Sequence, residues 1–322
     1  MKRRVTMQDI ADRLNITKVS VSKALNNQIG VSQSLRTRIL ETAEEMGYEA
    51  RKPEGLNKTF AFLMQKRFFL ETYKFYNVIF YHMNNLAKEK NCPFTPFVLE
   101  YDEERIQLPS NVDGVFIVGE IPDACIKSIP PEVPVVAIDF YRNYLDVNYV
   151  LVDNFYLGYY ITHYLIDRGH RDIGFVGNIN QTSSINDRYF GYIKALQNNN
   201  LASRRGCVIT NDADGVYRLD IDLPERLPTA FVCHCDMAAY FLMSSLKSIG
   251  KSVPDDVSLV SFDNTDLSLS TTPQLTSMDI DKKEIAVTAF SVMEQIIHGK
   301  EGCRRYYIST RLMERDSTKK VD

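Results

Sequence analysis

The strongest constraint on the fold is the regular alternation of short apolar runs and amphipathic stretches from residue 60 onward. The apolar runs are rich in β-branched and aromatic residues and lie at 60–64, 114–118, 134–138, 149–152, 172–176, 206–209, 229–233 and 257–262. Helical periodicity is found at about 76–90, 154–168, 184–199, 237–249 and 282–298. Apolar strands separated by helices predict parallel sheets covered on both faces. Because about 260 residues are more than a single hydrophobic core usually holds, the pattern favours two α/β lobes.

The composition excludes several classes of protein. With 44% hydrophobic and 25% charged residues, the chain is neither disordered nor fibrous. The longest apolar run, Met237–Met243, has seven residues, whereas a membrane span needs about 20. The basic start Met1–Arg4 is followed by a polar segment and not by the apolar core of a signal peptide. Six scattered cysteines fit a reducing compartment, so we expect a soluble, cytoplasmic protein without a membrane partner.

The charge is distributed unevenly along the chain. The whole chain has a net charge of −3, but residues 1–40 carry eight Lys/Arg and two Asp, a net charge of +6. The remaining residues therefore carry a net charge of −9. A basic segment on an acidic body suggests that the N-terminal part meets a polyanion.

Three short helices are predicted within the first 48 residues. Thr6 can cap the first helix with Asp9 in its first turn, Thr17 and Ser32 can cap the next two, and Gly47 can end the third. Apolar positions at helical spacing form one small core: Met7, Ile10, Ala11, Leu14, Val21, Ala24, Leu25, Leu35, Ile39, Ala43 and Met46. The outer face of the second helix then carries Lys18, Val19, Ser22 and Lys23. Lysines and hydroxyls on an exposed helix suit the DNA major groove.

Four segments of this region carry a family resemblance: Val5–Ala11, Val19–Asn26, Gly30–Ser32 and Arg38–Tyr48. They resemble the head of LacI/GalR-family (lac-repressor-like) transcription factors. The resemblance implies that Lys18, Val19 and Lys23 read base edges. It also implies phosphate contacts from Thr6, Thr17, Ser20, Ser22, Asn26 and Ser32, although each hydroxyl can serve instead as a helix cap. Lys23 stands where the family more often has arginine, and lysine lacks the planar fork that discriminates guanine.

The segment 49–59 departs from the family pattern. In the family this linker forms a hinge helix on DNA, and a leucine of that helix wedges into the minor groove. Here Leu56 is the only candidate wedge, and Gly55, close behind Pro53, costs a helix about 1 kcal/mol relative to alanine. We therefore predict a weak hinge helix or none, with a plain flexible tether as the alternative.

The body also resembles this family, whose effector domain is similar to periplasmic sugar-binding proteins. The resemblance rests on Val152–Gly158, Leu165–Gly177, Asp187–Tyr192, Pro228–Ala238, Val253–Asn264 and Pro273–Ser277. The predicted organisation is a three-helix helix-turn-helix head (1–48), a linker (49–59) and a two-lobed body of two parallel-sheet α/β lobes (60–322). The first lobe is expected at about 60–150 plus 281–303 and the second at about 151–280 plus 304–317.

Polar residues at the carboxyl ends of the predicted strands indicate a binding site, because ligands of such folds sit there. A carboxylate accepts two hydrogen bonds and a guanidinium donates two, so Asp and Arg on facing loops can hold the hydroxyls of a polyol. By the resemblance, the ligand contacts are Phe75, Tyr76, Asp139, Arg188, Cys235, Asp236 and Asp263. Phe75 and Tyr76 stand where family aromatics stack on a sugar, while Cys235 replaces a common asparagine and predicts a more apolar contact.

Purely structural roles remain as alternatives for several of these residues. Asp187 and Arg188 could form a local ion pair, Asp153 could simply cap a helix, and Phe75 could belong to the core. The segment 65–75 is longer than usual for this loop and is either a lid or a surface insertion.

Motifs of catalysis and metal binding are missing from the sequence. Cys233 and Cys235 lack the second ligand pair that tetrahedral zinc needs. The five histidines share no catalytic spacing, and no Gly-x-Ser-x-Gly, phosphate-loop or His-Glu-x-x-His pattern occurs. We expect no catalytic residue, no cofactor and no metal, and hence not an enzyme.

The sequence therefore predicts a homodimeric transcriptional regulator that binds a near-palindromic DNA operator. By the resemblance, it is a repressor of carbohydrate-use genes that a small sugar-type effector releases. One alternative is a corepressor-type regulator tightened on DNA by a purine-like ligand. Another, from a different class, is a sugar-binding or transport protein.

Overall fold

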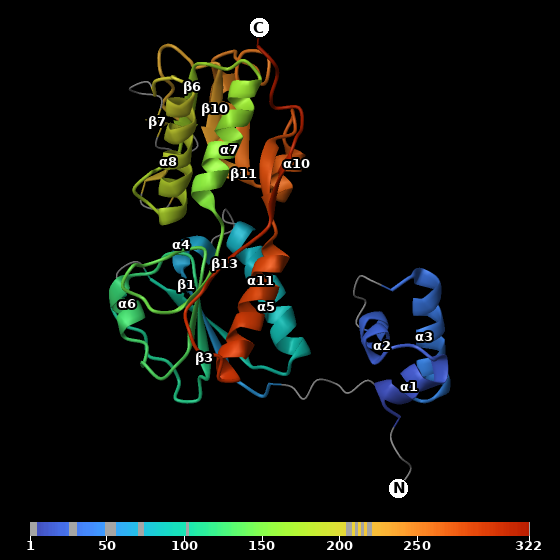
Figure 1. The fold of residues 1–322 in the computed structure, drawn as a ribbon. Coiled ribbons are helices and arrows are strands. Elements are labelled where there is room, and N and C mark those ends of the chain that lie inside the picture. The colour runs from blue at the N-terminus through green and yellow to red at the C-terminus, as the bar shows by residue number, and fades with distance from the viewer. Residues whose placement is uncertain are drawn as a thin grey trace. The chain divides into compact units, whose positions relative to one another are not determined.

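A computed structural model describes residues 5–25, 31–48, 56–69, 74–100, 103–203, 208–209, 212–213, 216–217 and 221–321. The chain divides into two compact units, Met1–Gly55 and Leu56–Asp322. Figure 1 shows the first unit as an all-helical head in blue and the second as an α/β body.

The head consists of α1 (Met7–Leu14), α2 (Lys18–Leu25) and α3 (Gln33–Glu45). Thr6 and Asp9 form a reciprocal capping box at the start of α1, and the Ser32 hydroxyl caps α3. Gly47 follows α3 with a φ of +67°, a conformation that glycine adopts without steric cost. The predicted helix signals and the predicted core are confirmed: the fully buried apolar residues are Ile10, Ala11, Val21, Ala24, Ile39 and Ala43.

The body contains two main sheets. In the first sheet the strand order is β13 (Arg305–Tyr307), β5 (Asn148–Leu151), β4 (Val135–Ile138), β3 (Gly114–Val118), β1 (Phe60–Gln65) and β2 (Phe94–Leu99), all parallel. In the second it is β14 (Thr310–Met313), β12 (Thr276–Ile280), β11 (Ser258–Asp263), β10 (Ala230–Cys233), β6 (Ile173–Val176) and β7 (Val208–Ile209). Within this second sheet, β14 is the only described strand that runs antiparallel to its neighbour. A small hairpin joins β8 (Asp212–Ala213) and β9 (Val216–Tyr217).

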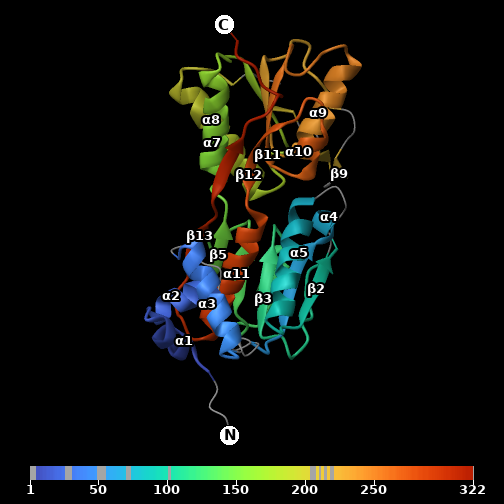
Figure 2. The ribbon, with the colours of Figure 1, turned by 90° about the vertical axis from the view of Figure 1, so that its right-hand side faces the viewer.

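Helices cover both faces of each main sheet, as the apolar strands require. The first lobe has α4 (Lys66–Phe69), α5 (Lys74–Glu89), α6 (Asp123–Lys127) and α11 (Lys282–Ile297), and the second has α7 (Asn154–Asp167), α8 (Ser183–Asn198), α9 (Asp236–Ser248) and α10 (Asp266–Ser270). Strand β1 illustrates the layering. Phe60, Phe62 and Met64 pack in the core beneath α5 and α11, while Ala61 and Leu63 pack in the core beneath α6. Figure 2 shows the two lobes one above the other, with α9 beside the upper sheet and α5 beside the lower one.

The chain passes between the lobes three times, at 152–153, at 281 and at 308–309. Asp153 and Asp281 cap α7 and α11 directly at two of these crossings. The third crossing differs from the expected boundary, which assigned 304–317 to the second lobe. Residues 305–307 form the edge strand β13 and pair in parallel with β5, so they belong to the first sheet.

Residues 49–55 of the predicted linker lie outside the described residues. Residues 56–59, which follow them, are not helical. Leu56 is partly buried against the core of the body, and its main-chain N–H donates to Lys90 O at 3.0 Å. Among the residues described, no helix is both long and apolar enough to span a bilayer.

Candidate functional site

The carboxyl ends of the strands in both lobes meet around one cavity. The first lobe contributes residues of α4 and α5 and the end of β4, and the second contributes α8, the end of β11 and the loop after β10. The cavity volume of about 170 Å³ is several times that of one water molecule, about 30 Å³. The structure brings all seven predicted ligand contacts together on its wall: Phe75, Tyr76, Asp139, Arg188, Cys235, Asp236 and Asp263. Their role in binding stays a prediction.

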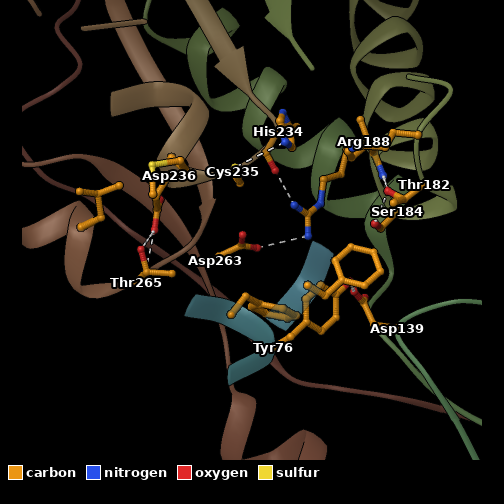
Figure 3. A pocket seen from close by; sticks show the side chains of 16 residues that line it. Tyr76, Asp139, Thr182, Ser184, Arg188, His234, Cys235, Asp236, Asp263 and Thr265 are labelled. Carbon is orange, nitrogen blue, oxygen red and sulfur yellow. Dashed lines mark hydrogen bonds and ion pairs between the residues drawn. The ribbon is translucent and has the colours of Figure 1, made fainter. Parts of the chain in front are cut away.

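Arg188 on α8 is the central cation of the cavity and is 95% buried, with a relative exposure of 5%. Its Nε donates to Asn154 Oδ1 at 2.8 Å, and one Nη donates to the main-chain oxygen of His234 at 2.5 Å. The other Nη lies 3.4 Å from Asp263 Oδ1 (Figure 3). The guanidinium also lies 4.5 Å from the centre of the Phe262 ring. These contacts hold it in one orientation before any ligand binds, which is the preorganisation that binding sites use.

Close packing of two helices brings Arg188 to this position. A Cβ atom on Gly158 of α7 would lie 2.1 Å from the main-chain oxygen of Arg188, and one on Gly191 of α8 would lie 2.1 Å from that of Phe155. Only glycine permits this approach. As a result, Asn154 in the first turn of α7 is within hydrogen-bond distance of Arg188.

Asp139 follows β4 with a φ of +61° and is buried. Tyr76 Oη donates to its Oδ2 at 2.7 Å, whereas Oδ1 accepts no hydrogen bond from the described residues. Burial raises the pKa of Asp139 to about 6, although the hydrogen bond from Tyr76 opposes this rise. One oxygen of this carboxyl group is thus buried without a hydrogen-bond partner among the described residues.

Asp236 differs from Asp139 because both oxygens of its carboxylate accept hydrogen bonds from other residues of the protein. Its oxygens accept from the hydroxyls of Ser261 and Ser277 at 2.6 and 2.7 Å and from the N–H and hydroxyl of Thr265 at 2.6 and 2.9 Å. These bonds tie α9 to β11, β12 and the start of α10. Burial nevertheless raises the pKa of Asp236 to about 6. The geometry thus favours a structural role for this carboxylate over direct ligand contact.

His234 and Cys235 form the upper wall in Figure 3. Burial lowers the pKa of His234 to about 4, so the ring is neutral at pH 7. Its Nδ1 lies 3.2 Å from the carbonyl oxygen of Val176, which can only accept, and therefore carries the proton. The sulfur of Cys235 lies 3.4 Å from His234 Nε2 and caps α9 by accepting from Ala238 N. The thiol thus offers a ligand little hydrogen-bonding capacity.

The open alternatives are now resolved in part. Arg188 pairs with Asp263 and not with Asp187, whose carboxyl faces a second cavity together with Tyr141 and Arg305. The interpretation of Asp153 as a helix cap is confirmed.

Phe75 is both buried and part of the cavity wall. In the segment 65–75, Phe68 lines the cavity, while residues 70–73 lie outside the described residues. The choice between lid and insertion therefore stays open.

Sequence reasoning missed the roles of several residues that shape the cavity, including that of Asn154, which was expected only as part of a helix cap. Asn154 holds Arg188, and Lys282 Nζ donates to the main-chain oxygen of Asp263. Thr182 and Ser184 at the start of α8 line the wall as well. The position of Asn154 at a strand end was the only available signal, and the contact of Lys282 arises from a segment far along the chain.

On the head, α2 presents the predicted base-reading residues. Lys18 and Val19 are exposed, with Val19 63% exposed, while Lys23 is half-buried. Val21 and Ala24 face the core. Positions 18, 19, 22 and 23 therefore share the outward face of the helix.

Four of the predicted phosphate contacts are already engaged in local hydrogen bonds. Thr6 and Ser32 act as caps, and the hydroxyls of Thr17 and Ser20 lie 2.9 Å apart at the start of α2. The predicted contact Asn26 lies outside the described residues. As a wedge, Leu56 would have to leave its packing against the body.

Comparisons with known proteins agree with both parts of the chain. Residues 6–50 match the family model of bacterial regulatory proteins of the lacI family, and residues 162–318 match that of the periplasmic binding protein-like domain. The HTH-type transcriptional repressor CytR of Escherichia coli (strain K12) is 27% identical over 343 residues, which cover 98% of this chain and 96% of CytR.

Two solved structures share the fold over the whole chain. A complex of the transcriptional regulator CelR with cellobiose has a TM-score of 0.69 at 21% identity, with 98% of this chain and 100% of CelR covered. The lac repressor dimer bound to operator and the anti-inducer ONPF has a TM-score of 0.63 at 18% identity, with the same coverage. The chain belongs to the LacI family of bacterial regulatory proteins, with a helix-turn-helix head and a periplasmic-binding-protein-like body.

Proposed function

We propose that the protein acts in the cytoplasm as a homodimer that represses carbohydrate-use genes from a near-palindromic operator, and that a small sugar-type effector releases it. The observation that carries the effector site is the preorganised Arg188, which lies with Asp263 and Asp139 on one cavity wall. Such a set can donate to and accept from vicinal hydroxyls. The cellobiose bound in the CelR structure supports a sugar as effector.

Release follows from a difference in affinity between two lobe arrangements. Tyr76 and Asp139 belong to the first lobe, and Arg188 and Asp263 to the second. A ligand that contacts both sets favours the arrangement in which they are close. It changes operator affinity only to the extent that it prefers that arrangement.

Operator recognition is assigned to Lys18, Val19 and Lys23. A dimer presents two copies of α2 to two half-sites, as in the operator-bound lac repressor dimer. The test is the triple variant Lys18→Ala, Val19→Ala, Lys23→Ala, with bound genomic fragments sequenced for both proteins. We expect loss of sequence preference. Unchanged preferences would overturn the assignment.

The control removes the same number of charges from the body, with Lys247→Ala and Lys283→Ala. Both lysines are exposed, so this double variant should keep the preferences of the wild type. Failure of the wild type to retard any operator at about 100 mM salt, where phosphate contacts still contribute, would favour the transport alternative instead.

The effector is tested by a thermal-shift screen of sugars, sugar phosphates and nucleobases. A ligand at about 100 times its dissociation constant adds about 2.7 kcal/mol of stability. Arg188→Ala should abolish the shift, whereas Arg226→Ala, which changes a mostly exposed arginine, should keep it. Retained ligand binding by Arg188→Ala would contradict the site assignment.

The sign of regulation is read from the same ligand added to an operator gel shift. Release of the operator supports the inducer mechanism. Tighter retention by a nucleobase would support the corepressor alternative.

A further inference from the structure

The hydrogen-bonding capacity of the cavity wall is concentrated beside α8 and the end of β11. Arg188 has five N–H groups and uses three of them on protein acceptors. Asp263 faces it with one of its two carboxylate oxygens. Gln181, just before α8, adds a half-buried amide to the same side of the wall. Ligand hydroxyls therefore find donors and acceptors here.

The other polar side chains of the second lobe on this wall already bond within the protein. Thr265 donates its only hydroxyl proton to Asp236 at 2.9 Å, and the hydroxyls of Thr182 and Ser184 lie 3.0 Å apart. His234 is neutral, and both of its ring nitrogens have protein partners. Little capacity for ligand hydroxyls remains at these positions.

Apolar side chains line the cavity next to Asp236 and Thr265. Met237 lies in the first turn of α9 and Leu267 in the first turn of α10, and both are half-buried. Because Asp236 ties the starts of these two helices together, both side chains lie on the same side of the cavity. Figure 3 shows Asp236 and Thr265 across the view from Arg188. An apolar group of the ligand would cover this apolar edge and remove it from water.

The first lobe contributes an aromatic wall of Phe68, Phe75 and Tyr76. Arg67 and Lys282 lie over the rings of Phe68 and Phe75 at 4.5 and 5.7 Å, but neither cation is on the described cavity wall. The ring surfaces that line the cavity suit the C–H face of a sugar. The cavity volume of about 170 Å³ fits one six-membered ring, since an engineered apolar cavity of about 150 Å³ holds benzene.

We propose that the effector is a 6-deoxyhexose: its ring hydroxyls bind Arg188 and Asp263, and its C6 methyl group lies against Met237 and Leu267. The inference rests on the proposed function, since it specifies the sugar of the same cavity. A hexose would place its C6 hydroxyl on the apolar edge, where burial without a partner costs binding free energy. A pentose would leave the edge uncovered. The methyl group avoids both costs.

The test compares sugars that differ only in the substituent at C5, by isothermal titration calorimetry and thermal shift on the full-length protein. Each set contains a 6-deoxyhexose, its parent hexose and the pentose with the same ring hydroxyls. The sets are D-fucose with D-galactose and L-arabinose, L-fucose with L-galactose and D-arabinose, L-rhamnose with L-mannose and L-lyxose, and 6-deoxy-D-glucose with D-glucose and D-xylose. In at least one set, the 6-deoxyhexose should bind at least tenfold more tightly than both of its partners, as expected when one hydroxyl or methyl group changes in an apolar pocket.

Two variants test the apolar edge. Leu267→Asn places an amide there that can bond a C6 hydroxyl, so the preference for the 6-deoxyhexose over its parent hexose should shrink at least tenfold. Met237→Gln should act in the same direction. Leu269→Asn is the matched control, because Leu269 lies in the same helix and is 51% exposed; this variant should keep the preference of the wild type.

Three results would overturn the inference: a parent hexose or pentose that binds as tightly as the 6-deoxyhexose in every set, a preference that survives both Leu267→Asn and Met237→Gln, or no binding of any 6-deoxyhexose. Binding of a hexose or pentose alone, lost in Arg188→Ala, would overturn it and leave the proposed sugar effector intact. Operator retardation by the wild type, measured separately, reports on the proposed function.

Discussion

Replacing Asp139 by asparagine should stabilise the ligand-free protein. Burial raises the pKa of Asp139 from 3.8 to about 6, and each pKa unit corresponds to about 1.36 kcal/mol of free energy. Ionised Asp139 therefore costs about 3 kcal/mol of unfolding free energy at pH 7.5. Asparagine removes the charge and keeps a carbonyl oxygen for the hydrogen bond from Tyr76. The unfolding free energy of the variant should thus exceed that of the wild type by up to about 3 kcal/mol.

The pH dependence gives this prediction a definite sign. Because the folded-state pKa lies above the unfolded-state value, the stabilising contribution of Asp139 is fully present below about pH 4 and is lost as the pH rises through about 6. The advantage of the variant should be about half as large at pH 5.0 as at pH 7.5, where it reaches about 3 kcal/mol. Asp236 also titrates with a pKa of about 6, but it is present in both proteins and largely cancels in the difference.

Urea denaturation followed by circular dichroism at pH 5.0 and 7.5 measures this difference. Asp222→Asn serves as the control and should change stability little at either pH, since Asp222 is exposed. The reasoning is refuted if Asp139→Asn is less stable than the wild type at pH 7.5, or if its advantage is the same at both pH values.

Gly158→Val should lower the unfolding free energy of the body by at least about 2 kcal/mol and displace Arg188, because the new side chain meets the Arg188 main chain. Urea unfolding measures the loss of stability, and the effector-induced thermal shift measures the displacement of Arg188. Wild-type behaviour in both assays would contradict the packing argument. Asp9→Ala should destabilise the head by about 1 kcal/mol through loss of the capping box with Thr6, seen as faster hydrogen exchange in α1 with unchanged unfolding of the body. Leu56→Ala should leave the operator bend unchanged in a permuted-site gel shift and destabilise the body by about 1–2 kcal/mol; a strong kink lost in this variant would show that Leu56 acts as a wedge.

Most central strands of the body were predictable because they are apolar and buried on both faces. The predicted strand at 114–118 coincides with β3, whose five residues are all buried. By contrast, β2, β13 and β14 were missed because they are edge strands with mostly exposed or half-buried residues. The interior strand β12 was missed because Thr276, Ser277 and Asp279 give it a polar sequence. An edge strand has one neighbour and needs less apolar surface, so its sequence carries a weaker signal.

The position of the site was predictable from the rule that ligands lie at strand ends, but the use of each side chain was not. Asp139 and Asp236 look alike in the sequence, yet one oxygen of Asp139 has no hydrogen-bond partner among the described residues, whereas Asp236 accepts four hydrogen bonds. The difference arises from Ser261 and Ser277, which lie on neighbouring strands and reach Asp236 only through the register of β11 and β12. Such long-range contacts leave no local pattern.

The three chain crossings have a mechanical consequence. They lie close together, since Ile308 N donates to Leu151 O and Ser309 N donates to Glu284 Oε2. One tether would let the lobes swivel freely, whereas three bundled tethers leave a single easy degree of freedom, bending about an axis through the bundle. Ligands of different shape would then produce the same bending motion of the lobes. They would differ only in the closure angle at which they stabilise the protein.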